Sequence, residues 1–169
     1  DLSLSIGGAK ILDGIALSVN QNEVLGIIGP NGAGKTSFFN LLSGVRKPTR
    51  GEIHIGDLDV THMKPYERAN VGLARTFQTS SIFANLTCLE NVRMAGMSVE
   101  NVPELVEIIR SLKVEHKKTV LIVEHHLEVI LGLADRIAVL NYGELLVCDT
   151  PQNVINNPIV QSAYIGEAL

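Results

Sequence analysis

One segment of the chain, residues 29 to 36, constrains the fold more than any other. It reads Gly-Pro-Asn-Gly-Ala-Gly-Lys-Thr, follows the apolar run 24–28 and precedes residues 37–42, which have the pattern of a helix closed by Gly44. A buried strand, a glycine-rich loop and a helix, in that order, form the context in which such a loop binds phosphate. A glycine-rich turn that binds nothing is the alternative, and both correct flanks argue against it.

The residue types of this loop suit phosphate chemistry. Glycines allow successive backbone N–H groups to approach phosphate oxygens without a Cβ in the way, and the N-terminus of the following helix adds partial positive charge. We expect Lys35 to reach the β- and γ-phosphates and the Thr36 hydroxyl to ligate Mg²⁺. The sequence therefore predicts binding of a nucleoside triphosphate by Gly29, Pro30, Asn31, Gly32, Ala33, Gly34, Lys35, Thr36 and Ser37.

Apolar patterns along the chain predict alternating strands and helices. The pattern favours strands over 2–5, 15–19, 24–28, 52–55, 119–123, 136–140 and 144–147, and helices over 37–42, 65–69, 102–114 and 127–133. The run 119–123 is suited to a fully buried parallel strand. We therefore expect one α/β domain over residues 1–169, with a mixed, mostly parallel core sheet flanked by helices and an antiparallel N-terminal portion.

Composition narrows the function classes. The net charge of −4, the absence of tryptophan and an aromatic content of 4% argue against a nucleic-acid partner. Cys88 and Cys148 have no metal-binding spacing and are expected to be small buried residues in a reducing compartment. The sequence shows no apolar run long enough for a membrane span and no secretory leader pattern, so we expect a soluble cytosolic protein.

Several further segments resemble the ATP-binding subunits of ABC transporters, and among them most closely the branched-chain amino acid uptake ATPases. The residues that carry the resemblance are the loop with its preceding strand, Ala-Arg-Thr-Phe-Gln at 74–78, Glu-His at 124–125, Leu-Ala-Asp-Arg-Ile at 133–137 and the tail 157–167. The likeness covers nearly the whole chain. It implies a P-loop NTPase fold of the ABC ATPase type.

The resemblance also implies catalytic residues and cofactors. Gln78 corresponds to the glutamine that ligates Mg²⁺ and orients the attacking water, and His125 to the switch histidine that contacts the γ-phosphate; with Lys35 they form the expected catalytic set for ATP and Mg²⁺. Metal ligands would be Thr36 and Gln78. The alternatives are a solvated loop glutamine and a histidine that caps the next helix.

Family membership would bring partners. It implies transmembrane permease subunits, a second ATPase subunit arranged head to tail, and indirectly a substrate-binding protein, with the chain peripheral on the inner face of the cell membrane. Residues 79–83 would line the groove for a permease helix, which makes Ile82 and Phe83 candidates for an exposed patch; ordinary core packing is the alternative for both.

The chain also departs from the family pattern. Between residues 91 and 119 the glycine-rich signature, the strand ending in Asp-Glu and the following aspartate loop are missing, so we expect a gap near 96–99, with the helical subdomain absent. The run 120–124 does not replace that strand, because no aspartate precedes Glu124 and His125 fits the switch position. Ile6 stands where the family has an aromatic residue that stacks on adenine, which loosens the expected base selectivity.

Two other functions remain open on this sequence. If the gap is real, a nucleotide-binding module without turnover becomes the leading interpretation. A different P-loop enzyme, such as a small-molecule kinase, is the other; it requires an acceptor site and an arginine-rich lid, and neither is visible in the sequence.

Overall fold

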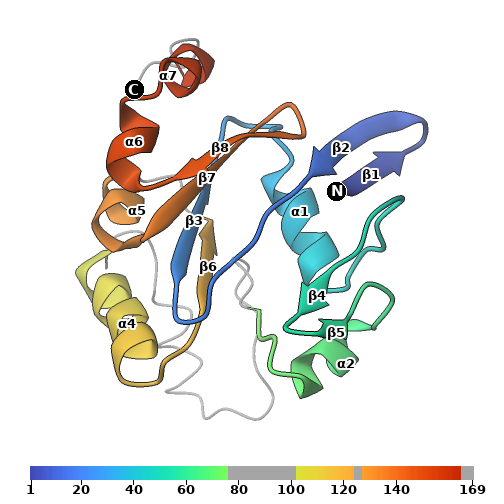
Figure 1. The fold of residues 1–169 in the computed structure, drawn as a ribbon, viewed down its shortest axis with the longest axis horizontal. Helices are drawn as coiled ribbons and strands as arrows, with labels where there is room; N and C mark the ends of the chain where they lie inside the picture. Colours follow the sequence, from blue (N-terminus) through green and yellow to red (C-terminus); the bar gives the residue numbers. More distant parts are fainter. Residues whose placement is uncertain (76–101, 124–126, 165–169) are drawn as a thin grey trace.

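A sheet of order β6-β3-β7-β8 forms the centre of the computed structural model, which describes residues 1–75, 102–123 and 127–164 (Figure 1). β3 pairs in parallel with both β6 and β7, and β8 runs antiparallel to β7. The expected mixed, mostly parallel sheet is therefore confirmed. The strands are β3 (Val24–Ile28), β6 (Val120–Val123), β7 (Arg136–Asn141) and β8 (Glu144–Asp149).

Helices cover both faces of β3 because its side chains alternate between them. Leu25 and Ile27 belong to the same apolar cluster as Phe38 and Leu41 of α1. On the other face Gly26 lies against α5, where an added Cβ would be 2.6 Å from Ile130 Cγ2. Figure 1 shows α1 on one side of the sheet and α4 and α5 on the other. These helices are α1 (Lys35–Leu42), α4 (Val102–Val114) and α5 (Leu127–Leu133).

The N-terminal portion is an antiparallel hairpin of β1 (Leu2–Ile6) and β2 (Ala9–Ile15). The prediction of a strand over 15–19 was wrong, because the turn at residues 7–8 brings 9–15 opposite 2–6 and the ladder ends at Ile15. Leu4 pairs with Leu12, and both are buried. Cross-strand pairing therefore outweighed the alternating pattern farther along the chain.

β6 is parallel as predicted, but the prediction that it is fully buried was wrong. All its residues are half-buried, whereas every residue of β3 is buried. β6 has β3 on one side and ends the sheet among the described residues. A strand's burial depends on its place in the sheet, and composition does not encode that place.

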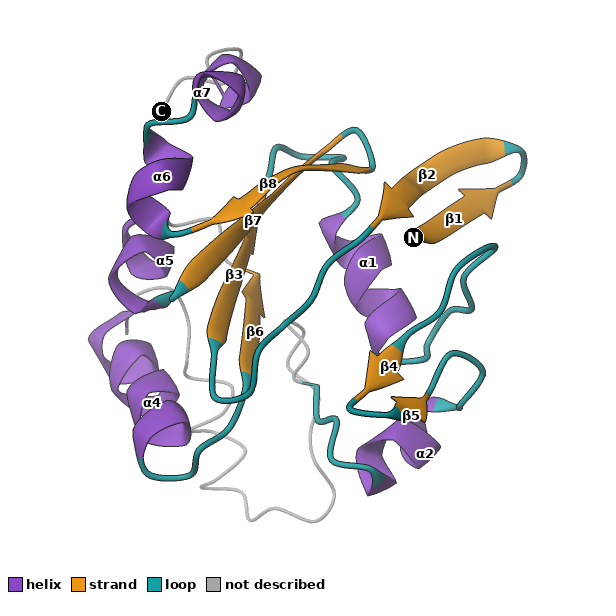
Figure 2. Ribbon diagram, viewed as in Figure 1, coloured by secondary structure: helices purple, strands orange, loops and turns teal. Residues whose placement is uncertain are grey.

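Shorter elements surround this core, as Figure 2 shows by type. A second small hairpin packs near α1 and leads into α2, and two helices follow β8. They are β4 (His54–Ile55), β5 (Leu58–Asp59), α2 (Pro65–Asn70), α6 (Pro151–Ile155) and α7 (Pro158–Tyr164). Within the described ranges, none of the helices has the length and apolar character needed to cross a bilayer.

Candidate nucleotide-binding site

The glycine-rich loop lies between the carboxyl end of β3 and the start of α1, as predicted. Its first residue, Gly29, passes so close to β7 that an added Cβ would lie 2.1 Å from the carbonyl oxygen of Leu140. Only glycine fits this contact. The loop ends at Gly34, whose left-handed conformation (φ 99°) turns the chain into α1. The backbone is therefore wrapped tightly against the sheet at both ends of the loop.

The N-terminus of α1 keeps its backbone donors available. The first N–H groups of a helix have no intrahelical partner, and here no side chain caps them and no acidic residue lies in the first turn, among the residues that the structure describes. The helix dipole places partial positive charge at the same point. This combination is what a phosphate group requires.

Lys35 folds back over the loop. Its ammonium donates to the carbonyl oxygens of Gly29 at 2.5 Å and Pro30 at 2.9 Å, and the residue is only 8% exposed. Thr36, next along the helix, is exposed. The structure thus brings the predicted loop residues together, with a buried cation beneath the loop and a hydroxyl-bearing residue at its rim.

A contact that the sequence analysis missed holds the loop from behind. In the turn between β7 and β8, the N–H of Gly143 donates to the carbonyl oxygen of Ala33 at 3.1 Å, and its own carbonyl oxygen accepts from the N–H of Asp13 at 2.9 Å. A Cβ at Gly143 would lie 2.4 Å from the carbonyl oxygen of Ile11. The turn therefore joins the phosphate loop to β2, and the Tyr-Gly dipeptide was its only local signal.

A buried ion pair fixes the other end of β3. Glu23 is 5% exposed and accepts from Arg136 Nε at 2.6 Å and from the Asn20 N–H at 2.6 Å. Burial alone raises the pKa of Glu23, but the hydrogen bonds from Arg136 and Asn20 outweigh it and leave the pKa below its ordinary value. Arg136 also donates to the sulfur of Cys148, which is half-buried and unbridged. These contacts anchor β3 to β7, so the strand that delivers the loop is rigid at its base.

Other predicted positions lie outside the described residues. Gln78, His125 and the expected gap at 96–99 are among them, as are Ile82, Phe83 and Cys88. Their roles stay predictions. Ile6 is described, at the end of β1, and its side chain is 41% exposed, which leaves an aliphatic surface where the resemblance places a stacking aromatic.

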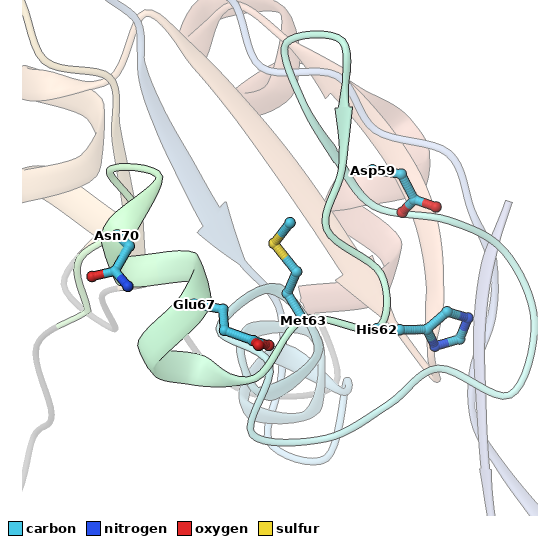
Figure 3. A pocket seen from close by; sticks show the side chains of 5 residues that line it. All are labelled: Asp59, His62, Met63, Glu67 and Asn70. Atoms are coloured by element: carbon cyan, nitrogen blue, oxygen red, sulfur yellow. The ribbon is translucent and has the colours of Figure 1, made fainter.

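A shallow pocket elsewhere does not compete for this role. It lies between β5 and α2 and is lined by Asp59, His62, Met63, Glu67 and Asn70 (Figure 3). Its acidic groups are already engaged: Asp59 accepts from Thr61, and Glu67 accepts from the N–H of Lys64. None of its lining residues belongs to the phosphate loop.

The strand, the loop and the uncapped helix define this chain as a phosphate-loop protein of the nucleotide-binding α/β class. The ABC transporter family model matches residues 12–153, and the chain belongs to that family. It resembles the solved structure of MJ1267, an ATP-binding cassette of an ABC transporter in its ADP conformation, with a TM-score of 0.80 and 23% identity over 98% of this chain and 96% of that one. A dimeric post-hydrolysis structure of the cassette MJ0796 bound to ADP and Pi gives a TM-score of 0.74 at 18% identity, over 89% of this chain and 96% of that one. The expected ABC ATPase fold is thereby confirmed.

The names of two relatives agree with the predicted resemblance. The chain is 26% identical to the high-affinity branched-chain amino acid transport ATP-binding protein LivG of Salmonella typhimurium and 25% identical to BraF of Pseudomonas aeruginosa, covering 99% of this chain and 96% of each relative. Each alignment spans 245 positions, whereas this chain has 169 residues. The difference, 245 − 169, means that at least 76 positions of each relative have no counterpart here. Placing that gap near 96–99 stays a prediction.

Proposed function

We propose that this chain binds ATP with Mg²⁺ at the phosphate loop and serves as the ATP-binding subunit that powers a membrane importer. The observation that carries the proposal is the loop itself, which wraps against β7 and leads into an uncapped helix N-terminus beside the buried Lys35. The names of its relatives support branched-chain or other hydrophobic amino acids as cargo.

The described residues fit Mg²⁺ as a companion of the nucleotide. Mg²⁺ keeps several waters and binds through few protein ligands together with substrate phosphates. Within the described ranges no cluster of three or more His, Cys, Asp or Glu side chains could hold a metal ion by itself. Thr36 would hold the ion through its hydroxyl, with Gln78 as the second proposed ligand.

Assembly follows from the same proposal. Transmembrane permease subunits would carry the cargo, a second ATPase subunit would pair head to tail, and a substrate-binding protein would act indirectly, with the chain peripheral on the inner face of the membrane. ATP would favour the closed pair and hydrolysis would reopen it, which is how a ligand drives a conformational change. Lys35, Gln78 and His125 are the proposed catalytic residues.

A specific observation keeps a second function in view. The sequence lacks a strand ending in Asp-Glu, which supplies the catalytic carboxylate in the family that it resembles. A nucleotide-binding module without turnover is therefore the alternative, and a phosphate-release assay with purified protein and permease subunits separates the two. Release above background that is lost in H125A supports the ATPase. Tight binding with no release supports the module.

Nucleotide binding itself is tested by titrating a fluorescent ATP analogue in the presence of Mg²⁺. K35A removes charge-assisted hydrogen bonds worth about 1.5–3 kcal/mol, so its Kd should rise about 10- to 150-fold. K118A removes an exposed lysine outside the loop and should bind like wild type. Equal affinities for K35A and wild type would reject the assignment of the loop.

A further inference from the structure

Two arginines from different segments meet at the C-terminal end of α1, the end opposite to the phosphate loop. Arg68 of α2 donates from Nη1 to the carbonyl oxygens of Leu41 and Leu42, each at 2.6 Å. Arg75 donates from Nη1 to Asn40 Oδ1 at 2.8 Å and to Ser43 Oγ at 2.7 Å. Positive charge at this end complements the helix dipole, whose positive end faces the phosphate site.

The two arginines bind the helix in different ways. Arg68 is fully buried, and its hydrogen-bond acceptors among the described residues are all backbone carbonyl oxygens, which do not change when a side chain rotates. Arg75 is half-buried and donates to two side chains of the last turn, those of Asn40 and Ser43, and more distantly to the backbone carbonyl oxygen of Phe39 at 3.4 Å. The bonds of Arg68 therefore depend on the backbone alone, whereas those of Arg75 to Asn40 and Ser43 also depend on the rotamers of these two side chains.

α1 has only eight residues, so its two ends are about 12 Å apart. A phosphate group that orders the first turn of this short helix should therefore also order its last turn. One nitrogen of the Arg75 guanidinium, Nη1, donates to Asn40 and Ser43, and the planar group fixes the direction of these N–H donors, which a freely rotating lysine ammonium does not.

We propose that Arg75 is a positioning residue: it ties the last turn of α1 to residues 71–75, so that nucleotide binding at the first turn also orders that segment. The inference rests on the proposed nucleotide site. Arg75 does not touch the nucleotide in this scheme. It acts through Asn40 and Ser43.

Hydrogen exchange of the full-length chain, measured by mass spectrometry with and without Mg-ADP, tests this. In wild type, Mg-ADP should slow exchange over residues 35–44 and over 71–75, each by about fivefold or more, the lower end of typical coupling between sites. In R75M the protection of 35–44 should remain, whereas that of 71–75 should disappear. N40A should lose part of the same protection, because the bond to Ser43 stays. Adding N40A to R75M should change nothing more, because R75M has already removed the bond to Asn40.

A merely structural role for Arg75 predicts a different pattern. It would speed exchange over 71–75 with and without nucleotide alike, and leave the nucleotide-dependent difference intact. R46M, which removes an exposed arginine just beyond α1, is the matched control and should behave like wild type. Protection of 71–75 that persists in R75M, or that is absent in a wild type that protects 35–44, overturns the inference. A wild type that binds no Mg-ADP rejects the proposed function, and this inference with it.

Discussion

Replacing Arg68 with methionine should destabilise the whole fold. The guanidinium is fully buried and donates to the carbonyl oxygens of Leu41, Leu42, Thr61 and Met63 at 2.6–3.2 Å. Leu41 has a second donor in the N–H of Gly44, but among the described residues the other three carbonyls have Arg68 alone. Burial also lowers the pKa of Arg68, because it disfavours the charged form.

The magnitude follows from those three carbonyls. A buried acceptor that loses its donor costs about 1–1.5 kcal/mol at the lower end of the usual range, so R68M should lose about 3–4.5 kcal/mol of unfolding free energy. A domain of ordinary stability has about 5–15 kcal/mol in total, so the loss is large. R68K keeps the charge, but an ammonium has fewer donors than a guanidinium and lacks its fixed fork. R68K should therefore lose about half as much unfolding free energy as R68M.

Urea unfolding followed by circular dichroism measures this loss without tryptophan, which the chain lacks. With a slope of about 2 kcal/mol per molar, the midpoint of R68M should fall by about 1.5–2.3 M. R46M should leave the midpoint unchanged. A shift under about 0.5 M for R68M would refute the reasoning, because it would mean that water replaces the guanidinium at all three carbonyls.

Two further changes probe the base of β3 and the wall of the loop. Because the folded-state pKa of Glu23 is lowered, its contribution to stability is present above the ordinary value of 4.5 and is lost as pH falls through the folded pKa. E23Q leaves Arg136 without its charge partner, so the free energy of unfolding at pH 7 should fall by about 3 kcal/mol. The dependence of the melting temperature on pH should also become flatter below pH 4.5. A pH dependence identical to that of wild type would contradict this. G29A places a methyl group against the carbonyl oxygen of Leu140, so nucleotide affinity should fall at least about tenfold while circular dichroism still shows a folded chain. An affinity equal to that of wild type would show that the backbone at Leu140 shifts to accommodate the methyl group.

Much of the central architecture could be predicted because its signals are local. The apolar run before the loop, the loop and the pattern of the helix lie within 20 residues, and each was confirmed by β3 and α1. The parallel β6 also follows from its short apolar run. The strand β8 was predicted, but its antiparallel direction was not, although the Tyr142-Gly143 turn before it was a local signal. α6 and α7, which we did not predict, each begin at a proline, Pro151 and Pro158, and that start signal was available.

What could not be predicted depends on contacts between distant residues. The sequence shows Arg68 in a short polar helix, with nothing nearby to indicate that it would be fully buried against α1. Likewise, Gly143 has a local reason to be a turn residue but none to bind Ala33, which is far away in sequence. The half-burial of β6 reflects its place at the end of the described sheet. In each case the burial or the hydrogen bond depends on which distant segment packs against the residue, and the residue type alone does not indicate that segment.

The pairing of β3 has a consequence for the order in which the chain can fold during synthesis. Both ladder partners of β3 come from the second half of the chain, β6 from residue 120 onward and β7 from residue 136 onward. The loop then needs Gly143 to bind Ala33. A nascent chain therefore cannot complete its nucleotide site until residue 143 has left the ribosome, and such long-range closure is slow. Until residues 120–141 have been synthesised, the apolar strand at 24–28 lacks both of these partners. During this interval its exposed apolar side chains make the nascent chain prone to aggregation, which is the condition that chaperones prevent.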